Sequence, residues 1–130
     1  MKIFLDTNAL ISLIVETEFT EEMRKILEKY INEEFYTSIN VIEETLYVLS
    51  KIFKKSKELC IKRIKELTEG LDIKIIKKLP FRMFLKIYLK YDLNPNDALV
   101  AAVCKYYKIR KIITFDREFE KVDFLEIIRL

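Results

Sequence analysis

Two apolar runs in this 130-residue sequence each lead into an aspartate. Ile3-Phe4-Leu5 is followed by Asp6, and the run from Ile112 to Phe115 is followed by Asp116. A short apolar run that stops at polar, turn-forming residues is typical of a buried strand. Parallel strands present their carboxyl ends at one edge of a sheet, where ligands bind in open α/β folds. We therefore expect Asp6 and Asp116 to converge at that edge.

Two further acids are placed to reach the same edge. Asp97 follows Asn94-Pro95, and this pair suits the N-cap and first position of a helix. Glu44 lies in the first turns of a helix expected after the second strand. A helix that follows a parallel strand begins at the edge where that strand ends, so four carboxylates from separate parts of the chain are predicted to share one cleft.

Such a cluster indicates a particular chemistry. Neighbouring carboxylates repel one another, and a bound cation removes that cost. Oxygen-only ligands suit Mg²⁺ or Mn²⁺, which also bind phosphate oxygens. The sequence contains no histidine, which excludes Ser-His-Asp and Cys-His catalysis and the usual zinc sites. The chemistry that fits is metal-assisted hydrolysis of a phosphodiester, with a carboxylate orienting or deprotonating the water.

Each acid also has a purely structural interpretation. Asp97 stands at the third helical position, where free N–H groups and the helix dipole favour an acid. Asp116 is placed to cap a turn. Glu43 and Glu44 flank opposite edges of one apolar arc, so either can be simply solvated. Asp6 resists such an interpretation, because a charge directly after a buried strand needs a partner.

The elements that must position these acids follow from hydrophobic periodicity. Thr20 is expected to be an N-cap, and Gly70, the only glycine, to end its helix in a left-handed cap. Strands alternate with helices, which indicates an α/β domain spanning residues 1–130, with a mainly parallel sheet of about four to five strands and helices on both faces. The expected strands are 3–5, 35–37, 72–77, 111–114 and 125–128; the expected helices are 9–15, 21–32, 38–53, 56–68, 79–91 and 95–107.

Composition agrees with a globular, cytoplasmic protein. Hydrophobic residues make up 51% and charged residues 35% of the chain, and the net charge is +3. Apolar stretches are too short to cross a membrane, and Asp6 interrupts the only candidate for a signal peptide core. Cys60 and Cys104 lie in helical patterns without metal-ligand spacing, so both are expected to be buried free thiols.

Four segments together resemble a known family. FLDTN at the start, Ser38 with Glu44 six residues on, LNPNDALVAA and IITFDREF look like a PIN domain, and more closely like the toxin ribonucleases of VapBC-type toxin–antitoxin pairs. The resemblance runs from Lys2 to Ile128. It implies a three-layer α/β/α fold and a metal-dependent endoribonuclease. It also favours Glu44 over Glu43, through the spacing from Ser38.

The resemblance implies roles for individual residues. Asp6, Glu44, Asp97 and Asp116 are expected to line a Mg²⁺ or Mn²⁺ site, with Asn8 and Thr114 supporting it through hydrogen bonds. An RNA substrate, a cognate antitoxin and a homodimer are the implied partners. Phe53 and the apolar sides of the helices around it are candidates for the antitoxin contact.

Local support for an RNA substrate comes from residues 51–65, which hold seven basic residues against one acid. Lys51, Lys54 and Lys55 begin this stretch, which suits a phosphate backbone but equally describes a solvated helix surface. Arg117, next to Asp116, is placed to touch a scissile phosphate.

Three other functions are weighed against a toxin. One is a PIN nuclease of RNA processing, and another is a catalytically weak PIN scaffold that only binds RNA or protein. The presence of all four acids argues against the scaffold. An acid after the first strand also marks aspartyl phosphatases, but these need a second acid two residues on, where this sequence has Asn8.

Overall fold

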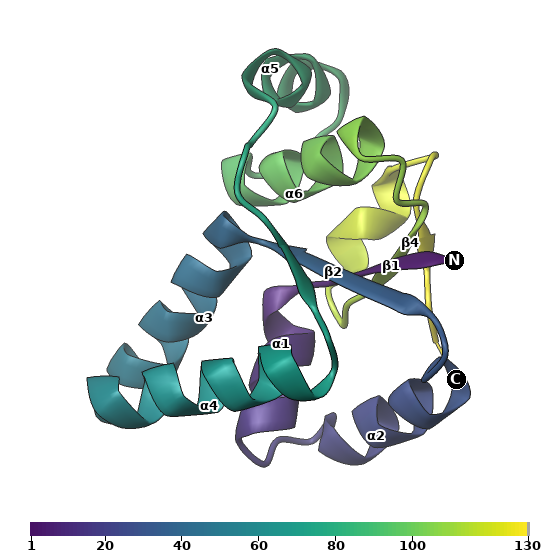
Figure 1. The fold of residues 1–130 in the computed structure, drawn as a ribbon. Helices are drawn as coiled ribbons and strands as arrows, with labels where there is room; N and C mark the ends of the chain where they lie inside the picture. Colours follow the sequence, from purple (N-terminus) through teal and green to yellow (C-terminus); the bar gives the residue numbers. More distant parts are fainter. Residues whose placement is uncertain (130) are drawn as a thin grey trace.

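The computed structural model describes residues 1–129 and contains one five-stranded sheet in the order β3-β2-β1-β4-β5 (Figure 1). Every neighbouring pair of strands is parallel. The five strands lie at the predicted places; the first two are longer than predicted and the last three are shorter. They are β1 (Lys2–Leu5), β2 (Glu34–Ser38), β3 (Lys74–Ile76), β4 (Lys111–Ile113) and β5 (Glu126–Ile127).

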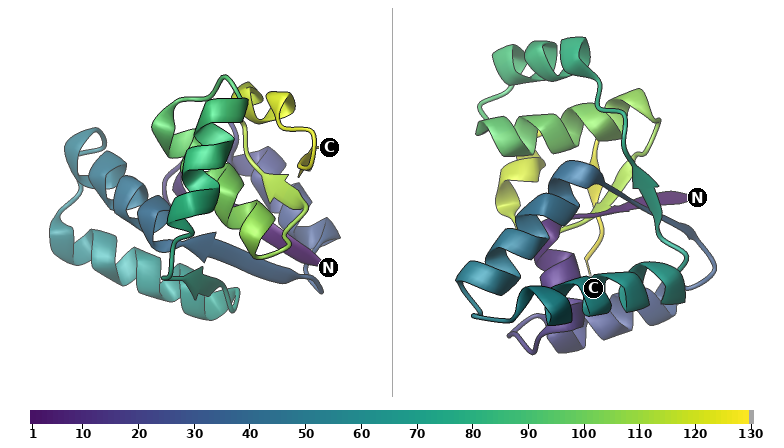
Figure 2. Two further views of the ribbon diagram at one scale, coloured as in Figure 1. Left: turned by 90° about the horizontal axis from the view of Figure 1, so that it is seen from above. Right: turned by 60° about the vertical axis from the view of Figure 1, so that its left-hand side comes forward.

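Helices cover both faces of this sheet, which confirms the predicted three-layer α/β/α class. In Figures 1 and 2, α5 and α6 lie on one side of the sheet, and α1, α2 and α4 lie on the other with α3 beside them. The helices are α1 (Thr7–Ile14), α2 (Thr20–Lys29), α3 (Ile39–Lys51), α4 (Lys57–Gly70), α5 (Phe81–Lys90) and α6 (Pro95–Tyr106), with a 3₁₀ helix η1 (Arg117–Lys121) before β5.

The core forms around β1 and α6. Ile3, Phe4 and Leu5 of β1 are completely buried, as expected for a central parallel strand covered on both faces. The apolar run that predicted a buried helix is α6, in which the residues from Val100 to Cys104 are also completely buried. Cys60 and Cys104 are both buried free thiols, as predicted.

The strand order places β1 at the point where the chain reverses its direction of winding. β1 has β2 on one side and β4 on the other, and Leu5 is in register with Ile113. The backbone N–H of Asp6 extends this ladder by donating to the carbonyl of Ile113 at 3.2 Å. In open α/β sheets, the carboxyl edge at such a switch point is where ligands bind.

Two predicted caps are wrong. Gly70 is the last residue of α4 and does not have a positive φ; Asp72 adopts the left-handed conformation instead, with φ of 49°. Thr20 is a buried residue inside the first turn of α2, and the N-cap is Phe19. The hydroxyl of Thr20 accepts from the N–H of Thr17 and donates to the carbonyl of Ser12, each at 2.9 Å, so it closes the preceding turn.

The predicted start of α6 is confirmed. Asn94 is the N-cap, Pro95 is the first helical residue, and the Asn94 side chain accepts from the N–H of Asp97 at 2.9 Å. Among residues 1–129, no helix is long and apolar enough to span a membrane.

Candidate active site

A cavity of about 440 Å³ opens at the carboxyl edge of the sheet, and all four predicted acids line it. Asp6 follows β1, Glu44 lies on α3, Asp97 lies on the first turn of α6, and Asp116 follows β4. The topology therefore brings together side chains that are up to 110 residues apart in the sequence. We call this space the carboxylate cavity. Its other lining residues are Thr7, Asn8, Ile11, Ser12, Thr17, Glu18, Phe19 and Val48.

Asp6 is only 5% exposed, although it carries a carboxyl group. The Thr114 hydroxyl donates to its Oδ2 at 2.9 Å. Burial raises the pKa of Asp6 to about 6; hydrogen bonds from the Thr7 backbone and Thr114 oppose this shift, and the charges of Glu44 and Asp116 add to it. Part of the cost of charging Asp6 therefore comes from the other acids of the cavity.

Hydrogen bonds join Asn8 to Thr114 and Thr114 to Asp6. Besides donating to Asp6, the Thr114 hydroxyl accepts from Asn8 Nδ2 at 3.3 Å and from the backbone N–H of Asp116 at 3.1 Å. The Thr114 hydroxyl thus uses its single donor and both of its acceptor lone pairs. Asn8 Oδ1 accepts from the N–H of Phe115 at 3.1 Å, which ties the end of β4 to α1.

Asp97 carries a carboxylate without a complete set of partners. It is 6% exposed, and its Oδ2 is buried with no hydrogen-bond partner. Burial and, after it, the charges of Asp116, Asp6 and Glu44 together raise the pKa of Asp97 to about 7. Because Asn94 already caps the helix, the start of α6 does not explain why an acid is buried here.

The two adjacent glutamates occupy different environments. Glu44 is half-buried, lines the carboxylate cavity and accepts a hydrogen bond from Asn96 Nδ2. Glu43 is exposed. The spacing from Ser38 favoured Glu44 over Glu43, and Glu44 is the one of the two that lines the cavity.

Asp116 has both of the arrangements foreseen for it. Its Oδ1 accepts from the N–H of Glu118 at 2.9 Å and so caps η1, while its side chain lines the carboxylate cavity. A cap uses one carboxylate oxygen, so this contact does not prevent Asp116 from facing the other acids.

The predicted basic contacts lie outside the carboxylate cavity. Lys51, Lys54 and Lys55 are exposed at the end of α3 and in the turn before α4. Arg117 is exposed, stands 4.0 Å from Glu120 and lines a neighbouring cavity. The three lysines do not line the carboxylate cavity, whereas Arg117 shares the neighbouring cavity with Asp116.

Several polar residues that line the cavity or act on its acids were not singled out from the sequence. Thr7 Oγ1 is buried there without a partner, Asn96 holds Glu44, and the charge of Glu118 contributes to the raised pKa of Asp97. Asn96 and Glu118 each lie within two residues of a predicted acid, and this proximity is the feature of the sequence that could have indicated them.

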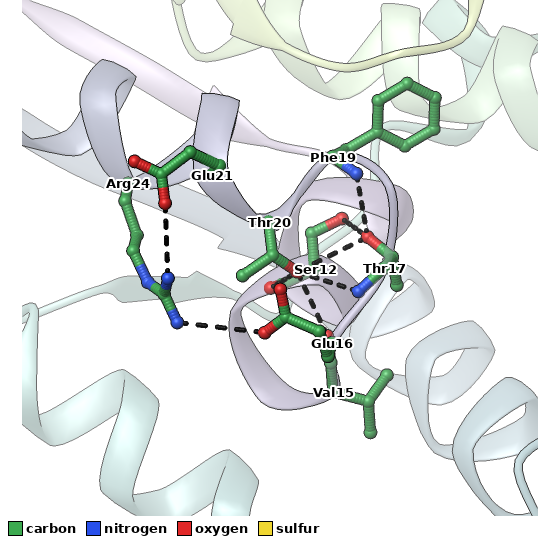
Figure 3. A network of polar contacts seen from close by, with 8 residues as sticks. All are labelled: Ser12, Val15, Glu16, Thr17, Phe19, Thr20, Glu21 and Arg24. Atoms are coloured by element: carbon green, nitrogen blue, oxygen red, sulfur yellow. Dashed lines mark hydrogen bonds and ion pairs between the residues drawn. The ribbon is translucent and has the colours of Figure 1, made fainter.

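The turn between α1 and α2 supplies another wall that sequence patterns did not indicate. Ser12 and Thr17 join their hydroxyls at 3.0 Å, and the Thr17 hydroxyl accepts from the N–H of Phe19 at 3.1 Å (Figure 3). This network fixes the path of the turn, and with it the positions of Glu18 and Phe19 on the cavity wall.

The donor set fits a hard divalent cation. The acids offer oxygen only, one buried carboxylate oxygen lacks a partner, and mutual repulsion opposes ionisation. Within residues 1–129, no three acids or other metal-binding side chains stand close enough to enclose an ion by themselves. Mg²⁺ tolerates this arrangement, because it keeps several waters and binds through one or two carboxylates plus substrate phosphate.

Comparison with known proteins agrees with this architecture. Residues 3–125 match the model of the PIN domain. Ribonuclease VapC2 of Methanocaldococcus jannaschii is 38% identical, over 99% of this chain and 94% of its own length.

Solved structures with similar folds have low sequence identity. VapC20 of Mycobacterium tuberculosis, a toxin that cleaves the sarcin-ricin loop, has a TM-score of 0.77 at 17% identity, covering 98% of this chain and 99% of its own. VapBC2 of Rickettsia felis, solved with a DNA fragment from its promoter, has a TM-score of 0.79 at 19% identity, covering 98% of both chains. The chain belongs to the PIN-domain family, and within it to the VapC ribonucleases.

Proposed function

We propose that this protein is a VapC-type toxin, an endoribonuclease that hydrolyses RNA phosphodiester bonds with Mg²⁺ or Mn²⁺ at the carboxylate cavity. One observation carries the proposal: four acids from four elements line a single cavity, and one of them keeps a buried, unpartnered carboxylate oxygen. A buried charge without a partner is costly, so the protein gains by filling this position with a cation.

Asp6, Glu44, Asp97 and Asp116 are the residues that would hold the ion. When bound, such an ion stabilises negative charge on the reacting phosphate and lowers the pKa of a water molecule. Thr114 fixes the orientation of Asp6 through its hydroxyl, and Asn8 fixes Thr114. Asn96 has the same orienting role for Glu44. Such outer contacts stiffen a site before substrate arrives.

Proton transfer in this cavity falls to carboxylates, because the sequence has no histidine. In the metal-free protein, burial and its acidic neighbours raise the pKa of Asp97 to about 7. A bound cation favours the charged form of a carboxyl group, so Asp97 would be ionised in the metal-loaded site.

A cognate antitoxin is the proposed protein partner. The similarity to VapBC2 supports it, and the structure provides an accessible surface for the predicted contact. Phe53 and Ile52 are exposed at the tip between α3 and α4. A cavity of about 200 Å³ between α1, α3 and α4 is lined by Leu49, Leu59 and other apolar residues, together with Lys55 and Arg63. The test is hydrogen exchange of this protein with and without a peptide of the cognate antitoxin. Protection of α3 and α4 by the peptide supports this surface, and protection confined to other elements argues against it.

The proposed homodimer is supported by an apolar stripe on α5. Phe81, Leu85, Tyr88 and Leu89 recur at helical spacing and are all exposed, and Leu89 is 89% exposed. A helix face of this kind is usually covered by another surface. Light scattering should report a dimer for the wild type and a monomer for Leu89→Glu; a dimer in both would place the interface elsewhere.

The function is tested by cleavage of single-stranded RNA with added Mg²⁺ or Mn²⁺. We expect Asp6→Asn and Asp97→Asn each to lower the cleavage rate on the order of 10³-fold, because several kcal/mol of charge stabilisation are lost. Asp72→Asn, outside the cavity, is the matched control and should cleave like the wild type. Undiminished cleavage by both cavity variants, with unchanged circular dichroism, would disprove the proposed site.

A further inference from the structure

A second cavity, of about 190 Å³, adjoins the carboxylate cavity. Phe19 and Asp116 line both spaces, so they stand at the boundary between them. Phe115, Arg117 and Arg129 also line the second space, which we call the aromatic cavity. The second cavity is therefore within direct reach of a chain bound at the acids.

The aromatic cavity has a rigid, flat wall. The rings of Phe19 and Phe115 are stacked with their centroids 4.2 Å apart and their planes at 8°. The backbone of each residue is held at the base of its ring. The N–H of Phe115 donates to Asn8 Oδ1, and the N–H of Phe19 donates to Thr17 Oγ1, each at 3.1 Å.

Figure 3 shows how the ring of Phe19 is presented. The hydroxyls of Ser12, Thr17 and Thr20 interconnect the turn before α2, and the ring of Phe19 points away from this network. A buried core aromatic is enclosed on both faces, whereas Phe19 and Phe115 are both only half-buried. The stack thus borders the cavity, although Phe115 also packs against the core.

Polar groups of both kinds complete the lining. Arg117 and Arg129 supply N–H donors, and Glu22 and Asp116 supply acceptors. Both arginines are also paired with Glu120, which lowers their effective positive charge. This balanced lining suits a phosphate poorly. It suits a flat ring whose edge carries donors and acceptors, which describes a nucleobase taken out of its stack.

We propose that the aromatic cavity is a nucleobase subsite, which holds the base of a nucleotide beside the cleaved bond of single-stranded RNA. The base extends the stack of Phe19 and Phe115, and its edge meets Arg117, Arg129 and the acids of the lining. This inference rests on the proposed ribonuclease function. It adds the path of the bound RNA, which runs from the carboxylate cavity, past Phe19 and Asp116, towards Arg129. Arg117 then contacts a base beside the reacting phosphate.

The binding experiment uses Asp97→Asn protein, so that the RNA stays intact. Single-stranded RNA oligonucleotides carry the fluorescent base 2-aminopurine at successive positions. We expect protein to quench fluorescence strongly at one position, through stacking, and Phe19→Leu in the same background to lose that quenching. Phe19→Tyr, which keeps an aromatic ring, should restore it. Tyr106→Leu removes an exposed aromatic ring outside both cavities and should leave the quenching unchanged.

The cleavage experiment uses the wild type and Phe19→Leu, both with Asp97 intact. The two RNA substrates are the intact RNA and one that lacks the base at the position where fluorescence was quenched. Stacking of one base is worth enough that its loss should lower kcat/KM by about 10-fold or more. Phe19→Leu should cleave the intact and the abasic RNA at equal rates. An equal abasic penalty in wild type and Phe19→Leu, or equal quenching in both, would overturn the subsite.

The two experiments separate this inference from the proposed function. Position-specific quenching that depends on Phe19, without any RNA cleavage by the wild type, would support the subsite and reject the nuclease. Cleavage that depends neither on Phe19 nor on a flanking base would support the nuclease and reject the subsite.

Discussion

The carboxyl edge of the sheet and the arm formed by α3 and α4 carry their charges in opposite ways. At the edge, Asp6 and Asp97 are 5% and 6% exposed, and their pKa values are raised to about 6 and about 7. On the arm, Lys51, Lys54 and Lys55 are exposed, and water stabilises their charges. Burying a charge is costly and exposing one costs little, so a buried acid indicates a specific role much more strongly than an exposed lysine.

The support beneath the buried acids should respond most strongly to mutation. Thr114→Val keeps the shape of the side chain but removes the hydroxyl that contacts Asp6, Asn8 and Asp116. Removing an orienting partner of this kind typically costs about 10- to 100-fold in metal affinity or activity. We therefore expect RNA cleavage to fall within that range.

A matched control is available on the arm. The Thr68 hydroxyl donates to the carbonyl of Ile64 within α4, and Thr68 lines neither cavity. Thr68→Val should leave cleavage unchanged within about twofold, the scatter expected of substitutions away from special features. If Thr114→Val also cleaves normally, the orientation of Asp6 does not matter for activity.

The same contrast predicts how stability depends on pH. Asp6 and Asp97 have raised pKa values, so between about pH 4 and 7 the folded metal-free protein binds more protons than the unfolded chain. Stability must then fall as the pH rises through this window. The two pKa values together correspond to a loss of roughly 6 kcal/mol across this window, measured by urea unfolding in the presence of a chelator.

Asp97→Asn tests the assignment of that pH dependence. The variant cannot be charged at this position, so its stability should depend less on pH and should exceed that of the wild type at pH 7. A wild-type stability that rises from pH 4 to 7 would contradict the assignment, because it would show that other groups of the protein offset the cost of ionising the buried acids.

The smallest effect is expected on the arm. If Lys51, Lys54 and Lys55 bind RNA phosphates, changing all of them to Gln lowers the slope of log affinity against log salt by about 1 for each phosphate that is no longer neutralised. The comparison is made by fluorescence anisotropy at several salt concentrations. An unchanged slope identifies the lysines as a solvated surface, the alternative that the sequence left open.

The sequence predicted most clearly those parts of the site that depend on local patterns. The apolar run before Asp6 predicted β1, and Asn94-Pro95 predicted the start of α6 together with the placement of Asp97. Both follow from rules that act over a few residues. The convergence of Asp6 and Asp116 also followed, because parallel strands end at a common edge.

Other parts of the site depend on tertiary contacts that no local pattern contains. Glu43 and Glu44 border the same apolar arc, so hydrophobic periodicity alone does not choose between them. The packing of α3 places Glu44 at the cavity, in agreement with the spacing from Ser38. Phe19 lies in a turn whose path is set by hydroxyl contacts between Ser12, Thr17 and Thr20. Gly70 was wrongly expected to be a left-handed cap because α4 is instead followed by a reversal at Asp72.

Glu43 and Glu44 also provide the most direct test of the central claim, that the carboxylate cavity holds a catalytic divalent ion. The two residues are chemically identical neighbours on α3, and only Glu44 lines the cavity. Mn²⁺ binding by calorimetry and RNA cleavage should be measured for Glu44→Gln and Glu43→Gln side by side. We predict that Glu44→Gln weakens both by about 10²-fold or more, and that Glu43→Gln changes neither beyond about twofold. Equal effects of the two substitutions would contradict the account.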